Sequence, residues 1–100
     1  MSMYVKGARF ERRVKRFFED LGFLVIRSAG SKPIDLVCIR EGEILLVECK
    51  TSIKEIRKST LKRILEIAVP FKAKAIVAAR EDKKIVLIDA QTSRRFQPGK

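Results

Sequence analysis

Apolar and polar residues follow one another along this chain in blocks that predict two helices and five strands. Between Tyr4 and Leu21, apolar residues recur at i, i+4, i+7, i+8 and i+11, which forms one stripe on a helix. The residues of this stripe are Phe10, Val14, Phe17, Phe18 and Leu21. A second helix is predicted from about Ser59 to Phe71. Strand-like apolar runs occupy Phe23–Arg27, Ile34–Arg40, Ile44–Lys50, Ala73–Ala79 and Ile85–Asp89. The order αβββαββ predicts an α/β domain with helices flanking a mixed central sheet.

Local signals predict where these elements end. Gly22 is placed to stop the first helix in the left-handed conformation, and Ser59 to cap the second. Pro70 either ends the second helix or kinks its last turn. The apolar face of that helix is predicted to consist of Leu61, Ile64, Leu65, Ala68 and Phe71. Residues 51–58 are predicted to be a connection, and residues 91–100 an irregular basic end.

The second and third strands flank Glu41-Gly42, a gap so short that it predicts a tight hairpin. If these two residues form the turn, the numbers of any two residues that face each other across the hairpin sum to 83. Asp35 then lies opposite Glu48. Their Cβ atoms would then be roughly 5 Å apart. Lys50 is two positions beyond Glu48 and points to the same face. Two carboxylates and a lysine would converge there, as in sites that hold a hard divalent cation beside a phosphate.

A structural explanation of the same residues is also open. Asp35 could cap a turn, and Glu48 and Lys50 could form a solvated pair at a strand edge. The neighbouring sequence favours burial instead, because both charged ends adjoin continuous apolar runs typical of strands covered on both faces. Facing carboxylates at the ends of buried strands need a cation or an altered pKa to be tolerated.

The residue types suit metal-dependent phosphodiester hydrolysis, which requires oxygen ligands for Mg²⁺ or Mn²⁺ and a group that activates water. Asp35 and Glu48 would supply ligands, and the backbone carbonyl of Cys49 lies between Glu48 and Lys50. Lys50 would position or deprotonate the attacking water and stabilise the charge of the transition state. Glu11 lies at the margin of the first helix's apolar stripe and could reach the same metal.

Several of these residues have simpler alternative roles. Glu11 could form an ordinary helix salt bridge with Lys15 at i+4. Arg12 and Arg27 are predicted to hold phosphates, whereas Ser31 could either donate to a phosphate or cap its loop.

Composition narrows the range of partners. One hundred residues make one domain, and a net charge of +11 with a pI near 10.2 indicates a polyanion: nucleic acid first, an acidic membrane surface second. The absence of an apolar run of membrane-spanning length and of a signal-peptide pattern predicts an intracellular, cytoplasmic protein. The lack of Asn, His and Trp, with abundant Lys, Arg, Glu and Ile, suggests a thermophile.

Cys38 and Cys49 are the only cysteines, and both are predicted to be small core residues. The hairpin register places them roughly 13 Å apart, too far for a disulfide. Apolar residues around the second helix exceed what one small core needs, which predicts a dimer face. These residues are Ile53, Ile56, Ile67, Val69 and Phe71.

The motifs also carry a resemblance to a known family. P-I-D, 12 further residues and E-C-K resemble the PD-(D/E)XK signature of restriction-endonuclease-like nucleases. The wider set is G-A-R-F-E-R, G-F-L-V-I-R-S-A-G-S, I-D-L-V and L-L-V-E-C-K-T-S. Over about residues 7–52 it closely resembles the archaeal Holliday junction resolvases of the Hjc and Hje type. The chain is short for that family, and its carboxyl end does not match.

The resemblance implies a restriction-endonuclease-like fold and a homodimeric, Mg²⁺-dependent endonuclease that cuts four-way DNA junctions by paired nicks in recombination and repair. The family's active-site residues fall on Glu11, Asp35, Glu48 and Lys50. Its positions for activity or DNA contact fall on Arg12, Arg27 and Ser31, and the neighbouring Arg9 and Lys32 are further candidates for DNA binding. Its dimer face falls on Leu65, Ile67 and Phe71. Residues 1–100 would form a single nuclease domain with core motifs at 7–52, a second helix and last strands at 59–89, and a basic tail at 91–100.

Three other functions compete with junction resolution. One is another nuclease of the same fold, of the restriction or repair type. The second is a catalytically silent DNA-binding dimer, against which the intact carboxylate–carboxylate–lysine set argues. The third is a small basic RNA-binding protein, but one Tyr and no Trp leave it without an evident stacking surface.

Overall fold

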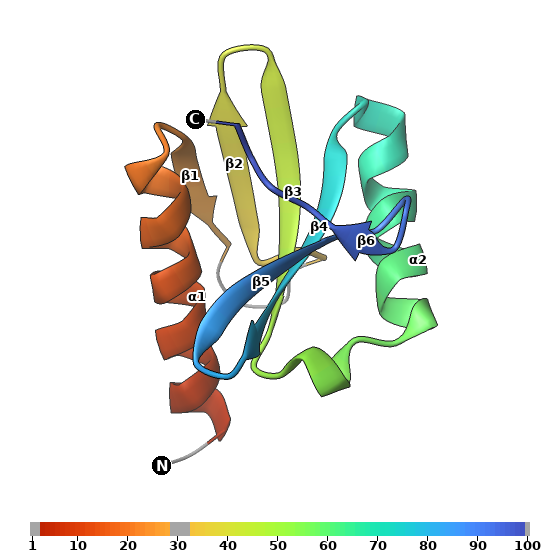
Figure 1. Ribbon diagram of the computed structural model, residues 1–100. Coiled ribbons are helices and arrows are strands. Elements are labelled where there is room, and N and C mark those ends of the chain that lie inside the picture. Colours follow the sequence, from red (N-terminus) through yellow and green to blue (C-terminus); the bar gives the residue numbers. More distant parts are fainter. Residues whose placement is uncertain (1–2, 29–32, 100) are drawn as a thin grey trace.

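A computed structural model of the chain describes residues 3–28 and 33–99. Its helices and strands form a single mixed sheet with a helix on each face (Figure 1). The elements are α1 (Met3–Asp20), β1 (Leu24–Arg27), β2 (Leu36–Arg40), β3 (Glu43–Lys50), the 3-10 turn η1 (Ile53–Glu55), α2 (Lys58–Ala68), the 3-10 turn η2 (Val69–Phe71), β4 (Lys74–Glu81), β5 (Lys84–Asp89) and β6 (Arg94–Arg95).

The six strands lie in sequence order, β1-β2-β3-β4-β5-β6. All neighbours are antiparallel except β3 and β4, which are parallel and are joined by the crossover through α2. The predicted mixed α/β architecture is therefore confirmed. The predicted order αβββαββ lacked one element, the short strand β6.

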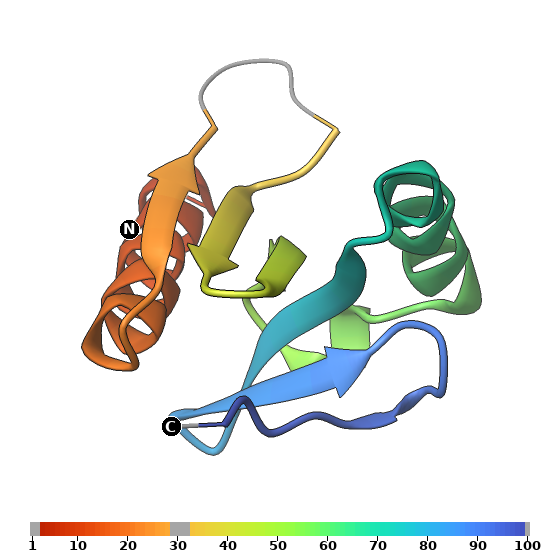
Figure 2. The same ribbon diagram turned by 90° about the horizontal axis from the view of Figure 1, so that it is seen from above.

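Two apolar clusters hold the helices against opposite faces of the sheet. Side chains that α1 buries, including Val14 and Phe18, pack with Leu36, Leu45 and Val47 on one face. On the other face, Ile64 and Ala68 of α2 pack with Leu46, Ala75 and Val77. Figure 2 shows α1 and α2 on either side of the sheet, with α2 over the part formed by β3 and β4. None of the helices in residues 3–28 and 33–99 is long and apolar enough to cross a membrane.

Gly22 ends α1 as the sequence predicts. Its φ is 92°, a left-handed conformation that a residue with a side chain adopts at a cost. The Gly22 N–H donates to the Glu19 carbonyl at 3.0 Å, and the Phe23 N–H donates to the Phe18 carbonyl at 3.1 Å. This pair of bonds satisfies carbonyls that would otherwise be left open at the helix end, and it turns the chain into β1.

The second helix begins at Lys58, close to the predicted start, but the predicted N-cap was wrong. Arg57, not Ser59, is the N-cap, and its N–H donates to the Thr60 hydroxyl at 3.4 Å. Thr60 is buried and is the third residue of the helix, where its hydroxyl accepts from the backbone of the N-cap residue. This contact fixes the N-cap at Arg57, two residues before Ser59. The α-helix ends at Ala68, and Pro70 lies in η2. Within the predicted connection, Ser52 caps η1 by accepting from the Lys54 N–H at 3.2 Å.

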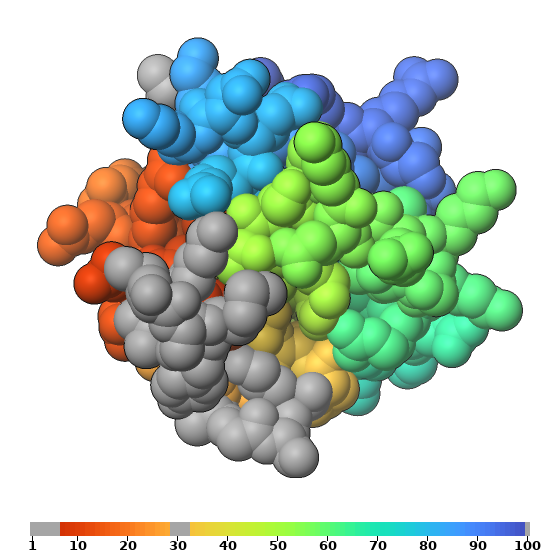
Figure 3. All heavy atoms as spheres, turned by 90° about the horizontal axis from the view of Figure 1, so that it is seen from below, coloured from red at the N-terminus to blue at the C-terminus, as the bar shows by residue number. Residues whose placement is uncertain are grey.

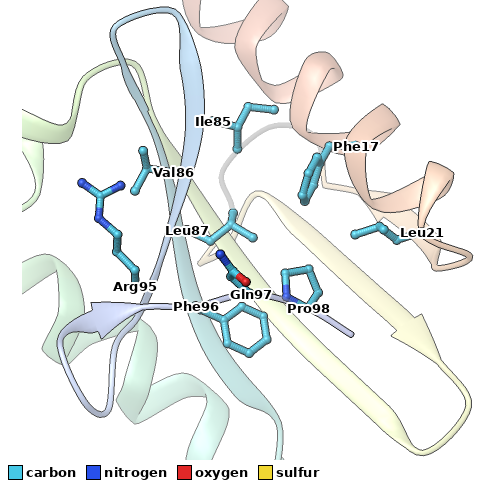
Figure 4. Close-up of a pocket in the computed structure, with 9 residues that line it drawn as sticks. All are labelled: Phe17, Leu21, Ile85, Val86, Leu87, Arg95, Phe96, Gln97 and Pro98. Atoms are coloured by element: carbon cyan, nitrogen blue, oxygen red, sulfur yellow. The ribbon is translucent and has the colours of Figure 1, made fainter. Parts of the chain in front are cut away.

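The carboxyl end is ordered, which corrects the prediction of an irregular tail. β6 pairs with β5, and the Phe96 N–H donates to the Leu87 carbonyl at 2.8 Å. Phe96 packs against the α1-side cluster. The tail residues Phe96, Gln97 and Pro98 line an open pocket together with Phe17 and Leu21 of α1 (Figure 4). The pocket has a volume of about 310 Å³. A two-residue polar strand carries no hydrophobic alternation, so a sequence pattern cannot reveal it.

Candidate active site

The β2–β3 hairpin has the predicted register. Gly42 adopts a φ of 73° in the two-residue turn, and Leu36 faces Val47. By continuation of this register, Asp35, just before β2, lies opposite Glu48 on β3. Both carboxylates are buried, with 6% of Asp35 and 8% of Glu48 exposed. The alternative of a solvated edge pair is therefore wrong.

Backbone hydrogen bonds fix Asp35 at the end of the hairpin. Its N–H donates to the Val47 carbonyl at 3.1 Å, and its Oδ2 accepts from the Cys49 N–H at 2.7 Å. The second bond is charge-assisted and draws the Asp35 carboxylate toward β3. The hairpin thus presents Asp35 and Glu48 together at one end of the sheet.

Two cations contact one oxygen of Glu48. Lys50 Nζ lies 3.7 Å from Glu48 Oε2, which confirms that the lysine and the glutamate share a face. Arg63 Nη2 lies 2.8 Å from the same Oε2. Opposite charges at these distances compensate the burial of the Glu48 carboxylate.

Arg63 is a residue that the sequence analysis missed. It projects from α2, and its Nη1 also donates to the Pro33 carbonyl at 2.8 Å. A usable signal exists in the sequence: Arg63 adjoins the fully buried Ile64 and is three positions from the buried Thr60. At 100° per residue it therefore lies on the margin of the inward face, as Glu11 does on α1.

Glu11 leans toward the sheet rather than along its helix. Its Oε1 lies 3.2 Å from Nε of Arg27, the last residue of β1. The alternative salt bridge with Lys15 is wrong, because Lys15 pairs with Glu19 at 3.5 Å. Arg27, predicted to hold phosphate, is thus positioned by a carboxylate from α1.

The Cys49 thiol reports the negative charge of this region. Burial raises its pKa well above the usual value, and the charges of Asp35, Glu11 and Glu48 raise it further. The charges of all three predicted acidic residues therefore act on the Cys49 thiol. Burial alone raises the pKa of Cys38 to about 12. Both cysteines are free, as predicted, and Cys38 is a core residue while Cys49 is partly buried.

The donor set fits Mg²⁺ better than a metal that needs many protein ligands. Within residues 3–28 and 33–99, no three His, Cys, Asp or Glu side chains converge as ready-made ligands. Mg²⁺ is commonly held by one or two carboxylates together with waters and substrate phosphates. Asp35 and Glu48 could serve as such a pair, with Lys50 and Arg63 already offsetting part of the Glu48 charge.

Basic side chains cover the outer surface of α1. Arg9 and Arg12 are exposed there and line an open groove of about 440 Å³ together with Arg13 and Arg16. Arg13 Nη2 donates to the Lys83 carbonyl in the β4–β5 turn, which ties the helix to that turn. The predicted contacts Ser31 and Lys32 lie outside the described residues.

A second groove lies next to the end of β3. It has a volume of about 490 Å³ and runs between residues 51–54 and residues 80–83. Its charged residues are of both signs: Lys54, Arg80, Glu81, Asp82 and Lys83. Figure 3 shows the face on which α1 (red), the segment after β3 (green) and the β4–β5 turn (blue) come together. Three separate parts of the chain thus meet on this face of the molecule.

The predicted dimer residues divide into two groups. Leu65 and Ile67 are partly buried and pack within the protomer, as does Ile56. Phe71 is 70% exposed, and Val69 is also exposed. The sheet adds an uncovered apolar surface that the sequence analysis missed. This bare sheet face comprises Leu24, Ile26, Ile39 and Ile44.

The fold and the site together define a restriction-endonuclease-like nuclease of the PD-(D/E)XK class. The family described as archaeal Holliday junction resolvase (Hjc) matches residues 2–98, and the chain belongs to this family. The match extends almost to the carboxyl end, so the expectation that this end departs from the family was wrong.

Two relatives illustrate the likeness. The chain is 42% identical over 89 residues to the crossover junction endodeoxyribonuclease Hjc of Methanocaldococcus jannaschii. The matched region covers 86% of this chain and 67% of that protein. It is similar in structure to Hjc of Archaeoglobus fulgidus, a Holliday junction resolvase from an archaeal hyperthermophile. That similarity has a TM-score of 0.73 and 27% identity, and covers 92% of this chain and 79% of the other.

Proposed function

We infer that this protein is a DNA endonuclease that resolves four-way (Holliday) junctions in recombination and repair. The observation that carries the proposal is the buried Asp35–Glu48 pair, set opposite each other in the hairpin with Lys50 beside them. Membership of the resolvase family supports the choice of substrate. As an enzyme that acts on recombining DNA, it would act inside the cell.

Asp35 and Glu48 would hold Mg²⁺, for which Mn²⁺ could substitute. When bound, the cation would stabilise the charge that develops on the scissile phosphate during hydrolysis. Glu11 is proposed to contribute from α1, either to the cation or by holding Arg27 at 3.2 Å. The carbonyl of Cys49 is a further proposed ligand. The placement of two buried carboxylates at one end of the hairpin favours this assignment, because one or two carboxylates commonly hold Mg²⁺.

Lys50 is the proposed proton-handling group. Its Nζ lies 3.7 Å from Glu48 Oε2, so the ammonium is held at the edge of the carboxylate pair. From there it can orient a water molecule toward a phosphate and offset negative charge as the phosphate is attacked. The same ion pair keeps the lysine side chain from moving freely before DNA binds.

The basic surface would bind the sugar–phosphate backbone. Twenty-three Lys and Arg residues against twelve acidic residues leave a strong excess of positive charge. Arg9 and Arg12 on the outer face of α1, with Arg27 at the end of β1, are the proposed phosphate contacts; Ser31 and Lys32 would add to them. Contacts of this kind carry no sequence information and weaken steeply with salt.

A second copy of the chain is the proposed partner. Paired nicks on opposite strands need two active sites held in a fixed relation. Phe71, Val69 and the bare sheet face supply an apolar surface that is unusual on an isolated domain of this size. A symmetric dimer would cover it and present two sites to the two sides of a junction.

The proposal is tested by cleavage of a labelled four-way junction and of a linear duplex with the same arm sequences. Each substrate is incubated with Mg²⁺ or with EDTA, using wild-type protein and Glu48→Gln. We expect symmetric, Mg²⁺-dependent nicks confined to the junction, and their loss in the variant. The variant should still bind the junction, because it lacks only a negative charge near the phosphates.

The alternative functions predict different results. Equal cutting of junction and duplex would retain a nuclease but reject junction selectivity. Tight junction binding with no cutting by wild type would indicate a silent DNA-binding dimer. Cutting by Glu48→Gln at the wild-type rate would refute the assignment of the metal site.

A further inference from the structure

Arg63 connects three parts of the candidate active site. It belongs to α2, its Nη2 lies 2.8 Å from Glu48 Oε2, and its Nη1 donates to the Pro33 carbonyl at 2.8 Å. Pro33 lies two residues before Asp35, in the segment that leads into β2. One planar guanidinium therefore bridges the two strand ends that carry the proposed ligands.

Both cations approach Glu48 through the same oxygen. Arg63 Nη2 lies 2.8 Å and Lys50 Nζ 3.7 Å from Oε2. With this oxygen held by a residue of α2, the rotation of the Glu48 carboxylate is restricted. A guanidinium suits this task, because its fixed fork makes two hydrogen bonds with one geometry.

We propose that Arg63 is a positioning residue that fixes the Glu48 carboxylate relative to the Asp35 segment, so that the pair is ready to receive a divalent cation. This inference rests on the metal site proposed above. Side chains that contact a metal ligand from outside the metal site set the orientation of that ligand, and their loss commonly costs 10- to 100-fold in metal affinity or activity.

A purely structural salt bridge explains the contacts less well. The Arg63 side chain is 47% exposed, so it adds little to the packing of α2 on the sheet, whereas its partner Glu48 is only 11% exposed. α2 is already anchored by Ile64 and Ala68, both fully buried. The helix does not need Arg63 to stay on the sheet, so its substitution should leave the fold intact.

The test compares Arg63→Gln and Arg63→Lys with Lys62→Gln, an exposed neighbour on α2 whose substitution removes the same charge. Mn²⁺ binding is measured on the DNA-free proteins by electron paramagnetic resonance, with Glu48→Gln as the reference for a lost ligand. Junction cleavage is then measured in single turnover across a range of Mg²⁺ concentrations. Thermal melting of each variant checks that the fold is retained.

We expect Arg63→Gln to bind Mn²⁺ about 10-fold more weakly than wild type and to cleave 10- to 100-fold more slowly, with a higher Mg²⁺ requirement. Arg63→Lys should be intermediate, since an ammonium restores the charge without spanning both acceptors. Lys62→Gln should retain wild-type Mn²⁺ binding. Its junction affinity in EDTA should fall by as much as that of Arg63→Gln.

Two results would overturn the proposal in different ways. If Mn²⁺ binding depends on Glu48 but is unchanged or tighter in Arg63→Gln, then Arg63 does not position the carboxylate and the metal site stands. If Mn²⁺ binding to wild type does not depend on Glu48, the metal site itself fails and the role of Arg63 fails with it.

Discussion

Phe71→Ala is expected to weaken dimerisation by about three orders of magnitude while leaving the protomer stable. Phe71 is 70% exposed in η2. A phenylalanine side chain buries on the order of 200 Å² when fully covered, so a partner could remove ~140 Å² of Phe71 from water. At about 25 cal/mol per Å² this corresponds to ~3.5 kcal/mol.

Alanine keeps part of that contact, so the substitution removes roughly 2 kcal/mol at each copy. A symmetric dimer contains the substitution twice, and the total of about 4 kcal/mol corresponds to a nearly 1,000-fold larger dissociation constant. The protomer should lose less than about 0.5 kcal/mol of unfolding free energy, because little of Phe71 is covered within it.

Sedimentation equilibrium over a wide concentration range measures the dissociation constant, and thermal melting at the lowest concentration measures the protomer. Glu66→Ala, an exposed substitution on the adjacent helix α2, is the matched control and should dimerise as wild type does. Junction cleavage should change from paired nicks to single, uncoupled nicks as Phe71→Ala dissociates. An unchanged dissociation constant would refute the assignment of Phe71 to the interface, as would a variant whose protomer melts much earlier.

Three further changes test other parts of the structure. Arg27→Ala should weaken both junction binding and cleavage, since it removes a proposed phosphate contact and the partner of Glu11; gel-shift and cleavage assays with unchanged results would leave Arg27 as mere surface charge. The pKa of Cys38 is about 12 in the folded protein against the usual 9.0, so unfolding releases a proton as pH rises above 9. Urea titrations measure the unfolding free energies of wild type and Cys38→Ala, and the difference between them should therefore narrow by about 1.4 kcal/mol between pH 8 and pH 10. A difference that stays constant would contradict the burial of the thiol. Phe96→Ala should cost roughly 2 kcal/mol of unfolding free energy, because Phe96 packs against the core from an ordered tail; a cost near zero would restore the picture of a frayed end.

Much of the fold was predictable, because its main signals are local. The stripe on α1 and the Gly22 stop depend on residues within a few turns of each other. The hairpin register follows from the two-residue turn at Gly42, which fixes every pair up to Leu36 and Val47. The opposition of Asp35 and Glu48 is an arithmetic consequence of that turn.

The features that were missed depend on contacts between distant segments. β6 exists because β5 offers an open edge to Arg94 and Arg95, and neither arginine carries a pattern of its own. Arg63 reaches Glu48 only because the crossover through α2 returns the chain over β3. The sequence also could not tell which apolar residues near α2 are buried within the protomer. Ile67 packs against the apolar cluster between α2 and the sheet, whereas Phe71, four residues later, is exposed.

The hairpin also links the two proposed features of the enzyme. Ile39 and Ile44 belong to the bare sheet face near the turn, and the alternation along the strands places them on the same side as Asp35 and Glu48. Four residues separate the two positions on each strand, or roughly 13 Å at strand rise. A paired two-stranded ribbon resists bending over so short a span, and its register forbids slippage. If the bare sheet face is covered by a second copy, each catalytic pair is held at a fixed distance from the dimer axis. The spacing of the two nicks would then be set by β2 and β3 themselves, rather than by any flexible segment of the chain.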